Sequence, residues 1–587
     1  MKSPERTHLL FHFFPFLKWF RNYSLSALGS DAQAGLTVAV ILIPQAMAYA
    51  MLAGLPPVYG LYSAAVTPFI SGLWGSLRQL ATGPIAIMSL LVLTTLGAYA
   101  QPGSPEYIGL ATLLAFMVGL LYLFIGLLRM GMVMSFISHS CVKGFTAAAA
   151  LIIIATQLPH FLGISVSRHE YIFPMMAEII RNIPECNPYT TLVGILSFAI
   201  ILLVRKFYQT LPAGLIALVI ATGILIIFEL EQFGVGIIGK VPEGLPGFAF
   251  PPFSFEMFSR LAGSTVVIAL VSFAETYSVG KSISAQTKQK VDVNQEFIGQ
   301  GMANLIGSFF QSYPVSGSFS RTAINYAAGA KSGVSGIFAS ILVILSLLFL
   351  TSLFTYIPRA ALAALVISAV LLLFHPKEVF RLWKMNRHDG IVAITVFVMG
   401  LVSKPDYALL IGVMISLIFF LWKTMHPRIV CISKDPKLNM FLNADSHKLP
   451  VCPQMLHLRL DSEVYFGNAQ FLAEHILKCL DEQEGPVKFL LLDFHSVAFI
   501  DITGIDELGV LLDDATLRGV RLAFMGIHEP VGSVFRSSGF IQEIESHLIF
   551  EKRGDAISSL FSYLNHDYCK NTCPHRIFGE CFTIKPE

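Results

Sequence analysis

Long apolar runs follow one another with short breaks from about Leu36 to Trp422. Since a helix needs roughly 20 apolar residues to cross a bilayer, this stretch predicts a series of transmembrane helices. The composition agrees, because 54% of the 587 residues are hydrophobic and only 13% are charged, against roughly 25% charged in a soluble domain. A mostly α-helical, polytopic membrane protein is therefore expected, and a soluble enzyme is not. The net charge of +2 gives no indication of a nucleic-acid partner.

The apolar runs predict about fourteen transmembrane segments, at 34–53, 57–75, 84–100, 106–129, 135–158, 189–206, 212–230, 262–280, 295–310, 319–330, 333–356, 359–375, 388–404 and 406–423. Basic residues follow nearly every even-numbered segment, as Arg129 and Lys423 do. By the positive-inside rule, these exits and both chain termini are predicted to be cytoplasmic. Aromatic and basic residues are mixed in residues 1–30, which suits an interfacial segment ahead of a membrane domain at 31–425.

Two interrupted segments occupy the third position in each group of seven. They are LATGPIAIMSLL at 80–91 and YPVSGSFSRTAI at 313–324. Paired short segments interrupted by Gly or Pro are typical of an inverted repeat with a binding site at the membrane midplane. The pattern therefore predicts a 7+7 inverted repeat, and it favours a transporter over a pore.

The first interrupted segment carries a predicted anion contact. Pro84 suits the first turn of a half-helix that begins inside the membrane. The amides of Ile85 and Ala86 would then lie at a positive helix end without helical partners.

The second interrupted segment repeats this arrangement at Phe319, Ser320 and Arg321, where Arg321 adds a full positive charge. Two helix N-termini with a guanidinium between them would form an anion site. The alternative is that the small residues only allow close helix packing.

Glu275 is the only acid in its predicted span. Because a charge at the bilayer centre costs at least about 2.5 kcal/mol, Glu275 is predicted to bind a coupling proton or cation. A structural ion pair, for which Arg321 is a candidate, or hydration near the cytoplasmic end is the alternative. Gln45 and Tyr49, four residues apart on one helix face, could donate hydrogen bonds to an oxyanion or to a neighbouring helix.

The strings PPVYGLYSA at 56–64, LATGPIAIMSLL, and KVDVNQEFIGQGMANLIGSFFQSYPVSGSFSRTAINYAAGA at 290–330 resemble the SulP/SLC26 anion transporter family. The resemblance covers nearly the whole chain. It implies a core that carries the anion, a gate that contacts lipid and a homodimer partner, and substrates such as sulfate, bicarbonate, chloride or dicarboxylates. The site residues that it implies are Gln45, Tyr49, Ile85, Ala86, Phe319, Ser320 and Arg321, with Glu275 for the coupling ion.

Proton coupling is the first hypothesis, because Val279, one turn after Glu275, offers no oxygen for a sodium site. Ser278 keeps sodium coupling open. The leading expectation is thus proton-coupled sulfate symport by an elevator-like core movement, in the plasma (bacterial inner) membrane. Sodium-coupled transport of bicarbonate or dicarboxylate, and an uncoupled channel or exchanger, are the alternatives.

Alternating strand and helix patterns at 454–565, after a linker at 426–453, predict a small cytoplasmic α/β domain. It resembles the STAS domain of SulP proteins, with Asp501 next to a helix N-cap. Ile502 occupies the position that is a phosphorylated serine in related anti-sigma antagonists, and an N-cap role is preferred to phosphorylation for Thr503. The domain is expected to bind a cytoplasmic regulator or support dimerisation and not to catalyse, since no nucleophile–base pair is visible.

The tail at 566–587 contains Cys569, Cys573, His575 and Cys581. Three thiols and an imidazole could hold zinc, and iron–sulfur ligation is conceivable. The tail lacks a Cys-x-x-Cys pair, however, so free reduced cysteines are preferred and no cofactor is predicted.

Overall fold

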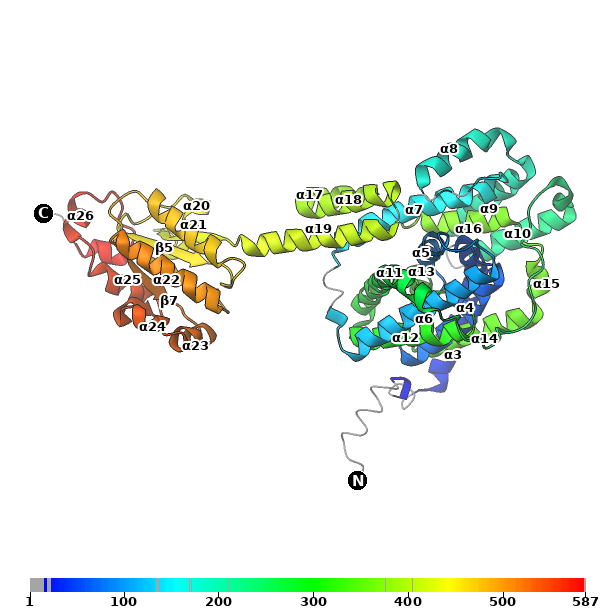
Figure 1. Cartoon of the computed structure of the whole chain (residues 1–587), viewed down its shortest axis with the longest axis horizontal. Coiled ribbons are helices and arrows are strands. Elements are labelled where there is room, and N and C mark those ends of the chain that lie inside the picture. The colour runs from blue at the N-terminus through cyan, green and yellow to red at the C-terminus, as the bar shows by residue number, and fades with distance from the viewer. Residues whose placement is uncertain are drawn as a thin grey trace, which may run out of the picture. The chain divides into compact units, whose positions relative to one another are not determined.

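The computed structural model describes residues 15–17, 23–132, 137–167, 169, 171–208, 211–374, 376–403, 405–435 and 437–584. The chain divides into two compact units, Met1–Leu417 and Ile418–Glu587. Most of the interfacial segment predicted at 1–30 lies outside the described residues. The first unit is helical and the second contains a mixed sheet (Figure 1).

Each predicted transmembrane segment corresponds to a helix. The first group of seven consists of α3 (Leu25–Leu52), α4 (Pro57–Trp74), α5 (Ala86–Leu96), α6 (Pro105–Leu127), α7 (His139–Leu162), α9 (Pro188–Phe207) and α10 (Ala213–Ile227). The second group consists of α11 (Phe255–Thr287), α12 (Val293–Phe309), α13 (Phe319–Ala327), α14 (Val334–Phe349), α16 (Arg359–Val370), α18 (Arg387–Val402) and α19 (Pro405–Met425). Three further helices connect them: α8 (Ile172–Asn182), α15 (Thr351–Phe354) and α17 (Pro376–Met385).

Local chemistry explains where several of these helices begin. The Ser104 hydroxyl accepts a hydrogen bond from the amide of Tyr107, and Pro105 takes the first helical position of α6. Ser138 caps α7 in the same way, through the amide of Cys141. Such caps replace helical bonds that the first turn lacks. Among the described residues, six helices are long and apolar enough to cross a membrane by themselves.

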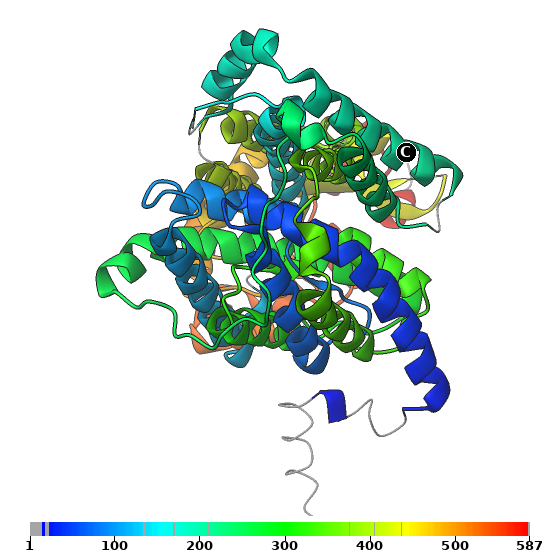
Figure 2. The same ribbon diagram turned by 90° about the vertical axis from the view of Figure 1, so that its right-hand side faces the viewer.

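The two groups of seven pack with reciprocal partners. The second helix of each group packs against the fourth helix of the other, as α4 against α14 and α12 against α6. The fifth helix of each packs against the sixth of the other, as α7 against α18 and α16 against α9. Figure 2 shows α8, α9 and α10 in teal, apart from the blue and green helices of the pairs α4–α14 and α12–α6. This exchange of partners is the packing expected of an inverted repeat with a core and a gate.

Glycines permit the closest helix contacts in the core. A Cβ added to Gly60 of α4 would lie 1.9 Å from the carbonyl oxygen of Ala46 in α3. A Cβ on Gly333, before α14, would lie 2.1 Å from the oxygen of Gly72. Small residues at membrane helix interfaces let the backbones approach in this way.

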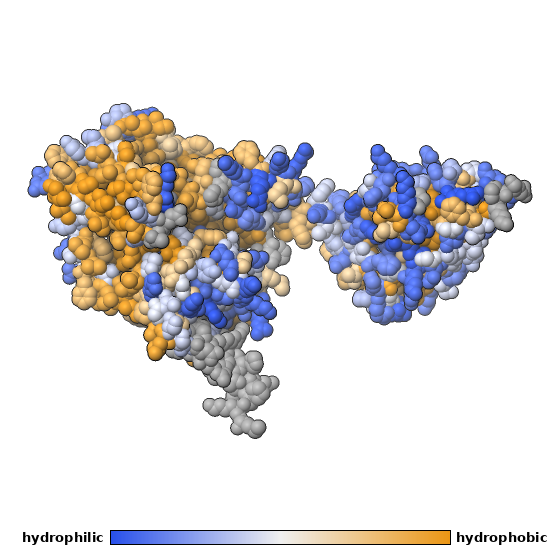
Figure 3. All heavy atoms as spheres, turned by 180° about the vertical axis from the view of Figure 1, so that it is seen from behind, coloured by the Kyte–Doolittle hydropathy of each residue, from blue (hydrophilic) through white to orange (hydrophobic). Residues whose placement is uncertain are grey.

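Hydrophobic side chains cover much of the outer surface of the helical unit (Figure 3). Large apolar residues of α9 and α10 are exposed, among them Leu192, Ile195, Val219 and Ile227. A soluble protein rarely exposes so continuous an apolar surface, and lipid accounts for it. The helical unit is therefore embedded in a membrane.

The second unit is a six-stranded sheet in the order β4-β3-β5-β6-β7-β8, parallel from β5 to β8. Its strands are β3 (Ile429–Asp435), β4 (Met440–Asn443), β5 (Met455–Leu460), β6 (Phe489–Asp493), β7 (Arg521–Met525) and β8 (Ile549–Phe550). Its helices are α20 (Ala444–His447), α21 (Ala469–Glu482), α22 (Ile502–Leu517), α23 (Glu529–Ser537), α24 (Phe540–Glu543), α25 (Arg553–Phe561) and α26 (His566–Asn571). The predicted α/β domain is confirmed.

Two boundaries of this domain differ from the prediction. The expected linker at 426–453 contains β3 and β4, and β3 pairs with β5. The segment was misread because Lys434, Asp435 and Lys437 interrupt its apolar pattern at the end of β3 and just after it. The expected separate tail at 566–587 also packs on the domain, since Ile577 and Phe578 are buried in its core.

Candidate anion site

The two interrupted segments meet as a two-stranded antiparallel pair. In β1 (Thr82–Gly83) and β2 (Ser316–Gly317), Thr82 lies opposite Gly317 and Gly83 opposite Ser316. Half-helices α5 and α13 begin shortly after these strands, with Ile85 and Ser318 as their N-caps. The two helix N-termini predicted from the sequence are therefore brought together, and their dipoles make the space between them attractive to an anion.

Side chains of α11 and α12 hold the strand pair. The amide of Asn304 brackets Val315, accepting from its N–H at 2.9 Å and donating to its carbonyl oxygen at 3.2 Å. Gln300 donates to the Thr82 hydroxyl at 2.8 Å. These buried polar bonds secure the backbone that positions both half-helices.

Arg321 of α13 is the central charged group of this region. Its side chain is 1% exposed, and Nη1 donates to Oε1 of Gln45 at 3.2 Å. Nε and Nη2 have no hydrogen-bond partner among the residues that the structure describes. A buried N–H group without a partner costs about 1–3 kcal/mol, and more when charged. The guanidinium is thus arranged to donate to a group that the chain itself does not supply.

The other predicted site residues differ in how far they are buried. Gln45 and Tyr49 are buried on α3, and Gln45 accepts from Arg321, so it orients the guanidinium. Ile85 and Ala86 are buried at the α5 terminus. Their helix end has no side-chain cap, so its first amides remain available. Phe319 is 41% exposed, and Ser320 is exposed as well.

Tyr313 was missed by the sequence reasoning. It is buried in the loop before β2, and its hydroxyl lies 3.1 Å from that of Ser89 in α5. It thus links the second interrupted segment to the half-helix of the first. Its position directly before Pro314 was the available signal.

Glu275 of α11 is half-buried, and it differs from the fully buried acids of this unit. Its Oε2 has no hydrogen-bond partner within the described part of the chain. Arg321, the counter-charge considered from the sequence, bonds Gln45, and no hydrogen bond or ion pair joins it to Glu275 among the described residues. A structural pair therefore does not explain Glu275.

Asp31 and Glu296 show what structural acids look like in this fold, and the sequence reasoning had missed both. Asp31 accepts from the amides of Lys331 and Ser332. Glu296 accepts from the amides of Ser76 and Leu77, at 2.9 and 3.1 Å. Both carboxylates tie the first repeat to the second. By contrast, Oε2 of Glu275 accepts no such hydrogen bond from the described residues.

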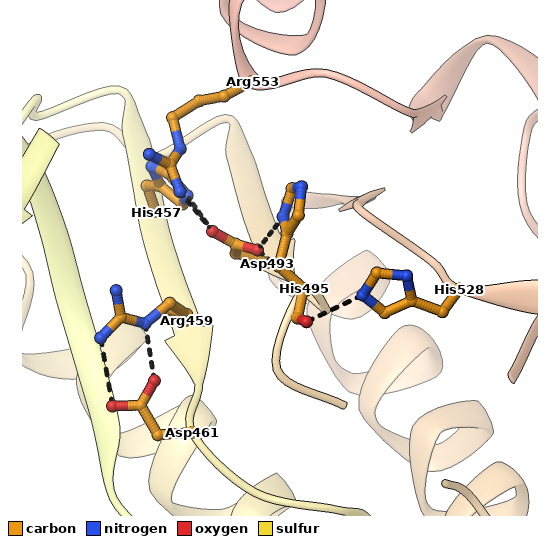
Figure 4. Close-up of polar contacts among 7 residues, drawn as sticks. All are labelled: His457, Arg459, Asp461, Asp493, His495, His528 and Arg553. Atoms are coloured by element: carbon orange, nitrogen blue, oxygen red, sulfur yellow. Dashed lines mark hydrogen bonds and ion pairs between the residues drawn. The ribbon is translucent and has the colours of Figure 1, made fainter. Parts of the chain in front are cut away.

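The C-terminal unit contains its own buried acid, Asp493, at the end of β6 (Figure 4). Oδ1 lies 2.6 Å from Nδ1 of His495, and Oδ2 accepts from Arg553 at 2.7 Å. The buried His457 lies 3.7 Å from Oδ2. Burial alone would raise the pKa of Asp493, but these partners outweigh it and hold the pKa below its usual range. Burial lowers the pKa of His457 below its ordinary value.

This histidine predicts how the stability of the C-terminal domain depends on pH. The folded domain lowers the pKa of His457 and so disfavours its protonation, whereas the unfolded chain binds a proton below a pH of about 6.5. The free energy of unfolding should therefore fall as the pH decreases below about 6.5, by at most about 1.4 kcal/mol per pH unit. The Asp493 carboxylate adds a further decrease in the free energy of unfolding only at much lower pH. Urea unfolding at a series of pH values, monitored by hydrogen exchange in β5 and β6, would measure this decrease. His457→Gln should flatten this dependence, whereas His447→Gln, at an exposed histidine of α20, should not. An unchanged slope in His457→Gln would contradict the assignment.

The loop that ends at Asp501 in the same domain leads into α22. Asp501 is itself the N-cap, and its carboxylate accepts from the amides of Gly504 and Phe466, each at 2.8 Å. Thr503 is an exposed first-turn residue and not the cap. The capping role belongs to the aspartate.

The zinc set considered in the tail is not assembled. In the described ranges, no group of three or more His, Cys, Asp or Glu residues is placed to hold a single metal ion. His575 instead uses its backbone oxygen, which accepts from the Cys573 thiol.

Two half-helix termini around a buried guanidinium, within a membrane-embedded inverted repeat, define the class as a transporter of small anions. The sulfate permease family model matches residues 28–396, and the STAS domain model matches residues 447–556. The chain belongs to the sulfate permease (SulP/SLC26) family, whose members are transporters and not enzymes.

Named relatives and solved structures agree with this assignment. "Sulfate transporter 4.1, chloroplastic" of Arabidopsis thaliana is 34% identical over 570 residues, covering 94% of this chain and 83% of the relative. The "Sodium-independent sulfate anion transporter" of Bos taurus is 34% identical, covering 89% and 88%. The solved structure of SLC26A9 matches with a TM-score of 0.85 at 23% identity, covering 99% of this chain and 96% of that one. The transmembrane domain of the cyanobacterial bicarbonate transporter BicA matches with a TM-score of 0.58 at 22% identity, covering 67% and 98%. The structural matches support the fold.

Proposed function

We propose that this protein is a secondary active transporter that carries sulfate together with protons. The single observation that carries the proposal is the buried guanidinium of Arg321, with Nε and Nη2 unpartnered among the described residues. A tetrahedral oxyanion would accept from these two donors and from the first amides of α5 and α13. Relatives named as sulfate transporters favour sulfate among the candidate anions.

Glu275 is the proposed coupling site. Its buried Oε2 lacks a hydrogen-bond partner in the described structure, whereas Asp31 and Glu296 are both satisfied by amides. A carboxylate that can gain and lose a proton within the membrane is a natural coupling element. Sodium coupling remains the alternative, through Ser278 one turn away, with bicarbonate or a dicarboxylate as the cargo.

Alternating access would come from movement of the core past the gate. The core is the helix set α3–α6 with α11–α14, and the gate is the set α7, α9, α10, α16, α18 and α19. The proposed assembly is a homodimer in the plasma membrane, with both termini cytoplasmic and the STAS domain open to a regulator. An uncoupled exchanger or channel would need neither the coupling acid nor this movement.

Reconstitution of the purified protein in liposomes tests the proposal. Uptake of labelled sulfate, bicarbonate, chloride and a dicarboxylate would be compared with and without sodium, and with and without an inward proton gradient. We expect sulfate uptake that rises with the proton gradient and ignores sodium. Sodium-dependent uptake, or flux that does not respond to either gradient, would overturn the proposed proton coupling. Failure of sulfate to compete with the other anions would overturn the assignment of sulfate as the substrate.

A further inference from the structure

Helix α17 exposes basic and large apolar side chains next to one another. The exposed basic residues of the helix and of the turn after it are Lys377, Arg381, Lys384 and Arg387. Three large apolar residues of the same helix are also exposed, namely Phe380 (77%), Trp383 (46%) and Met385 (72%). Such a combination of basic and aromatic residues on one short helix is typical of a segment that lies at a membrane interface.

Contacts with two helices of the gate hold α17 in place. It packs against α7 and α18, and only Asn386 separates it from the start of α18 (Figure 1). A Cβ added to Gly390 of α18 would lie 2.6 Å from the Cα of Trp383, so this glycine allows the two backbones to approach closely. Val379 and Leu382 of α17 are half-buried. The helix therefore uses only part of its apolar surface for packing within the chain.

The chain does not neutralise the positive charge of α17. Within the described ranges, Lys377, Lys384 and Arg387 form no ion pair, and Arg381 lies 3.6 Å from Glu378 of the same helix. An exposed pair of this kind contributes little to stability. The basic side chains are therefore free to bind negative charge from outside the protein.

Asp389, at the start of α18, already has partners of its own. Its carboxylate accepts from the hydroxyl of Ser140 at 3.0 Å and from the side-chain amide of Asn386 at 2.9 Å. These bonds connect α18 to α7. The acid thus stabilises the gate.

The position of α17 in the chain favours lipid as the source of the negative charge. Leu371 and Leu372 precede the helix and Ile391 and Ile394 follow it in α18, and all four side chains are exposed on the membrane-embedded unit. The helix thus connects two spans whose apolar side chains face lipid. Tryptophan is enriched at the ends of such spans, and lysine and arginine there extend their charged ends to the headgroups. An acidic protein surface would match the charge but not this apolar continuity.

We propose that α17 binds the headgroups of anionic phospholipids. Lys377, Arg381 and Lys384 contact the headgroups, while Phe380 and Trp383 insert beside the acyl chains. Since each basic residue near an anionic membrane surface contributes about fivefold to binding, an anionic lipid is favoured over a zwitterionic one. Because α17 packs on α7 and α18, such lipids anchor the gate. The assignment does not depend on the transported anion or on the coupling ion.

Quenching of Trp383 by brominated lipid tests the proposal on the full-length protein in lipid nanodiscs. The chain has four tryptophans, so Trp19→Phe, Trp74→Phe and Trp422→Phe together leave Trp383 as the only one. Phosphatidylglycerol or phosphatidylcholine with brominated acyl chains would be mixed in turn with the other lipid, unbrominated, over a series of fractions. We expect both to quench, with phosphatidylglycerol favoured about fivefold or more.

Two results of this experiment would overturn the proposal. Equal quenching by the two lipids would show that α17 has no preference for anionic headgroups. Absence of quenching by either lipid would show that a second copy of the chain or another protein covers the helix.

Charge-removing variants give the matched control. Combined Lys377→Gln, Arg381→Gln and Lys384→Gln should lower the preference for phosphatidylglycerol to below about twofold, while quenching by phosphatidylcholine persists because the apolar side chains remain. A control variant removes three exposed basic residues at and after the end of α11, by Lys281→Gln, Lys288→Gln and Lys290→Gln, and it should keep the preference. A preference that survives in the α17 variant, or that falls equally in the control, would contradict the site. The wild-type helix in the two lipids decides the question even where a variant does not fold.

Discussion

Arg321→Ala is expected to reduce the apparent affinity for sulfate by roughly a hundredfold or more while leaving the protein inserted and folded. The substitution removes two unpartnered guanidinium donors, and each charge-assisted hydrogen bond to an anion contributes about 1.5–3 kcal/mol. Arg321→Lys should recover only part of the affinity, because an ammonium cannot supply the planar pair of donors. Labelled-sulfate uptake at a range of concentrations would measure both effects.

The control for this experiment is Arg260→Ala. Arg260 is exposed on α11 and pairs with Glu256 of the same helix, so its removal should leave sulfate affinity unchanged. An Arg321→Ala variant with normal sulfate affinity would contradict the proposed anion site.

Glu275→Gln is expected to abolish the dependence of sulfate uptake on the proton gradient. Glutamine keeps the size of the side chain but cannot release a proton at any relevant pH. Accumulation driven by the gradient should therefore disappear, while exchange of internal for external sulfate persists. Uptake into liposomes with and without an imposed gradient, together with counterflow, separates these two activities.

Two other acids provide matched comparisons. Glu256 lies on the same helix but on the surface. The Glu256→Gln variant should therefore behave as the wild type. Glu296→Gln should instead lower stability, because its carboxylate accepts from two backbone amides. Gradient-driven uptake that survives in Glu275→Gln would show that the coupling site lies elsewhere.

The sequence predicted the outline of the site because that outline is local. Pro84, together with the small residues around Ser318, signals where each half-helix begins, and the lone Arg321 signals charge at such a beginning. Whether two such termini meet depends on pairing between β1 and β2, more than 200 residues apart, and the paired positions in the two groups of seven were the only hint of it.

What the sequence could not provide are contacts between distant side chains. Asp31 and Glu296 were given no role from the sequence, and only the fold reveals that amides of the other repeat donate to their carboxylates. Gln45 was expected to donate to an oxyanion or a neighbouring helix, and the acceptance of a hydrogen bond from Arg321 by its Oε1 was not foreseen. Cys452 lines the same pocket as the tail cysteines but lies more than a hundred residues before them, so no spacing rule could have placed it there.

The pairing of β1 with β2 has a consequence for the origin of such a chain. Each repeat supplies one strand and one helix terminus, so a single repeat would carry half of the site and an unpaired strand edge inside the membrane, which is costly. A one-repeat ancestor could have bound an anion only as two copies inserted in opposite orientations. Fusion of two copies would have made that opposite-facing partnership permanent within one polypeptide.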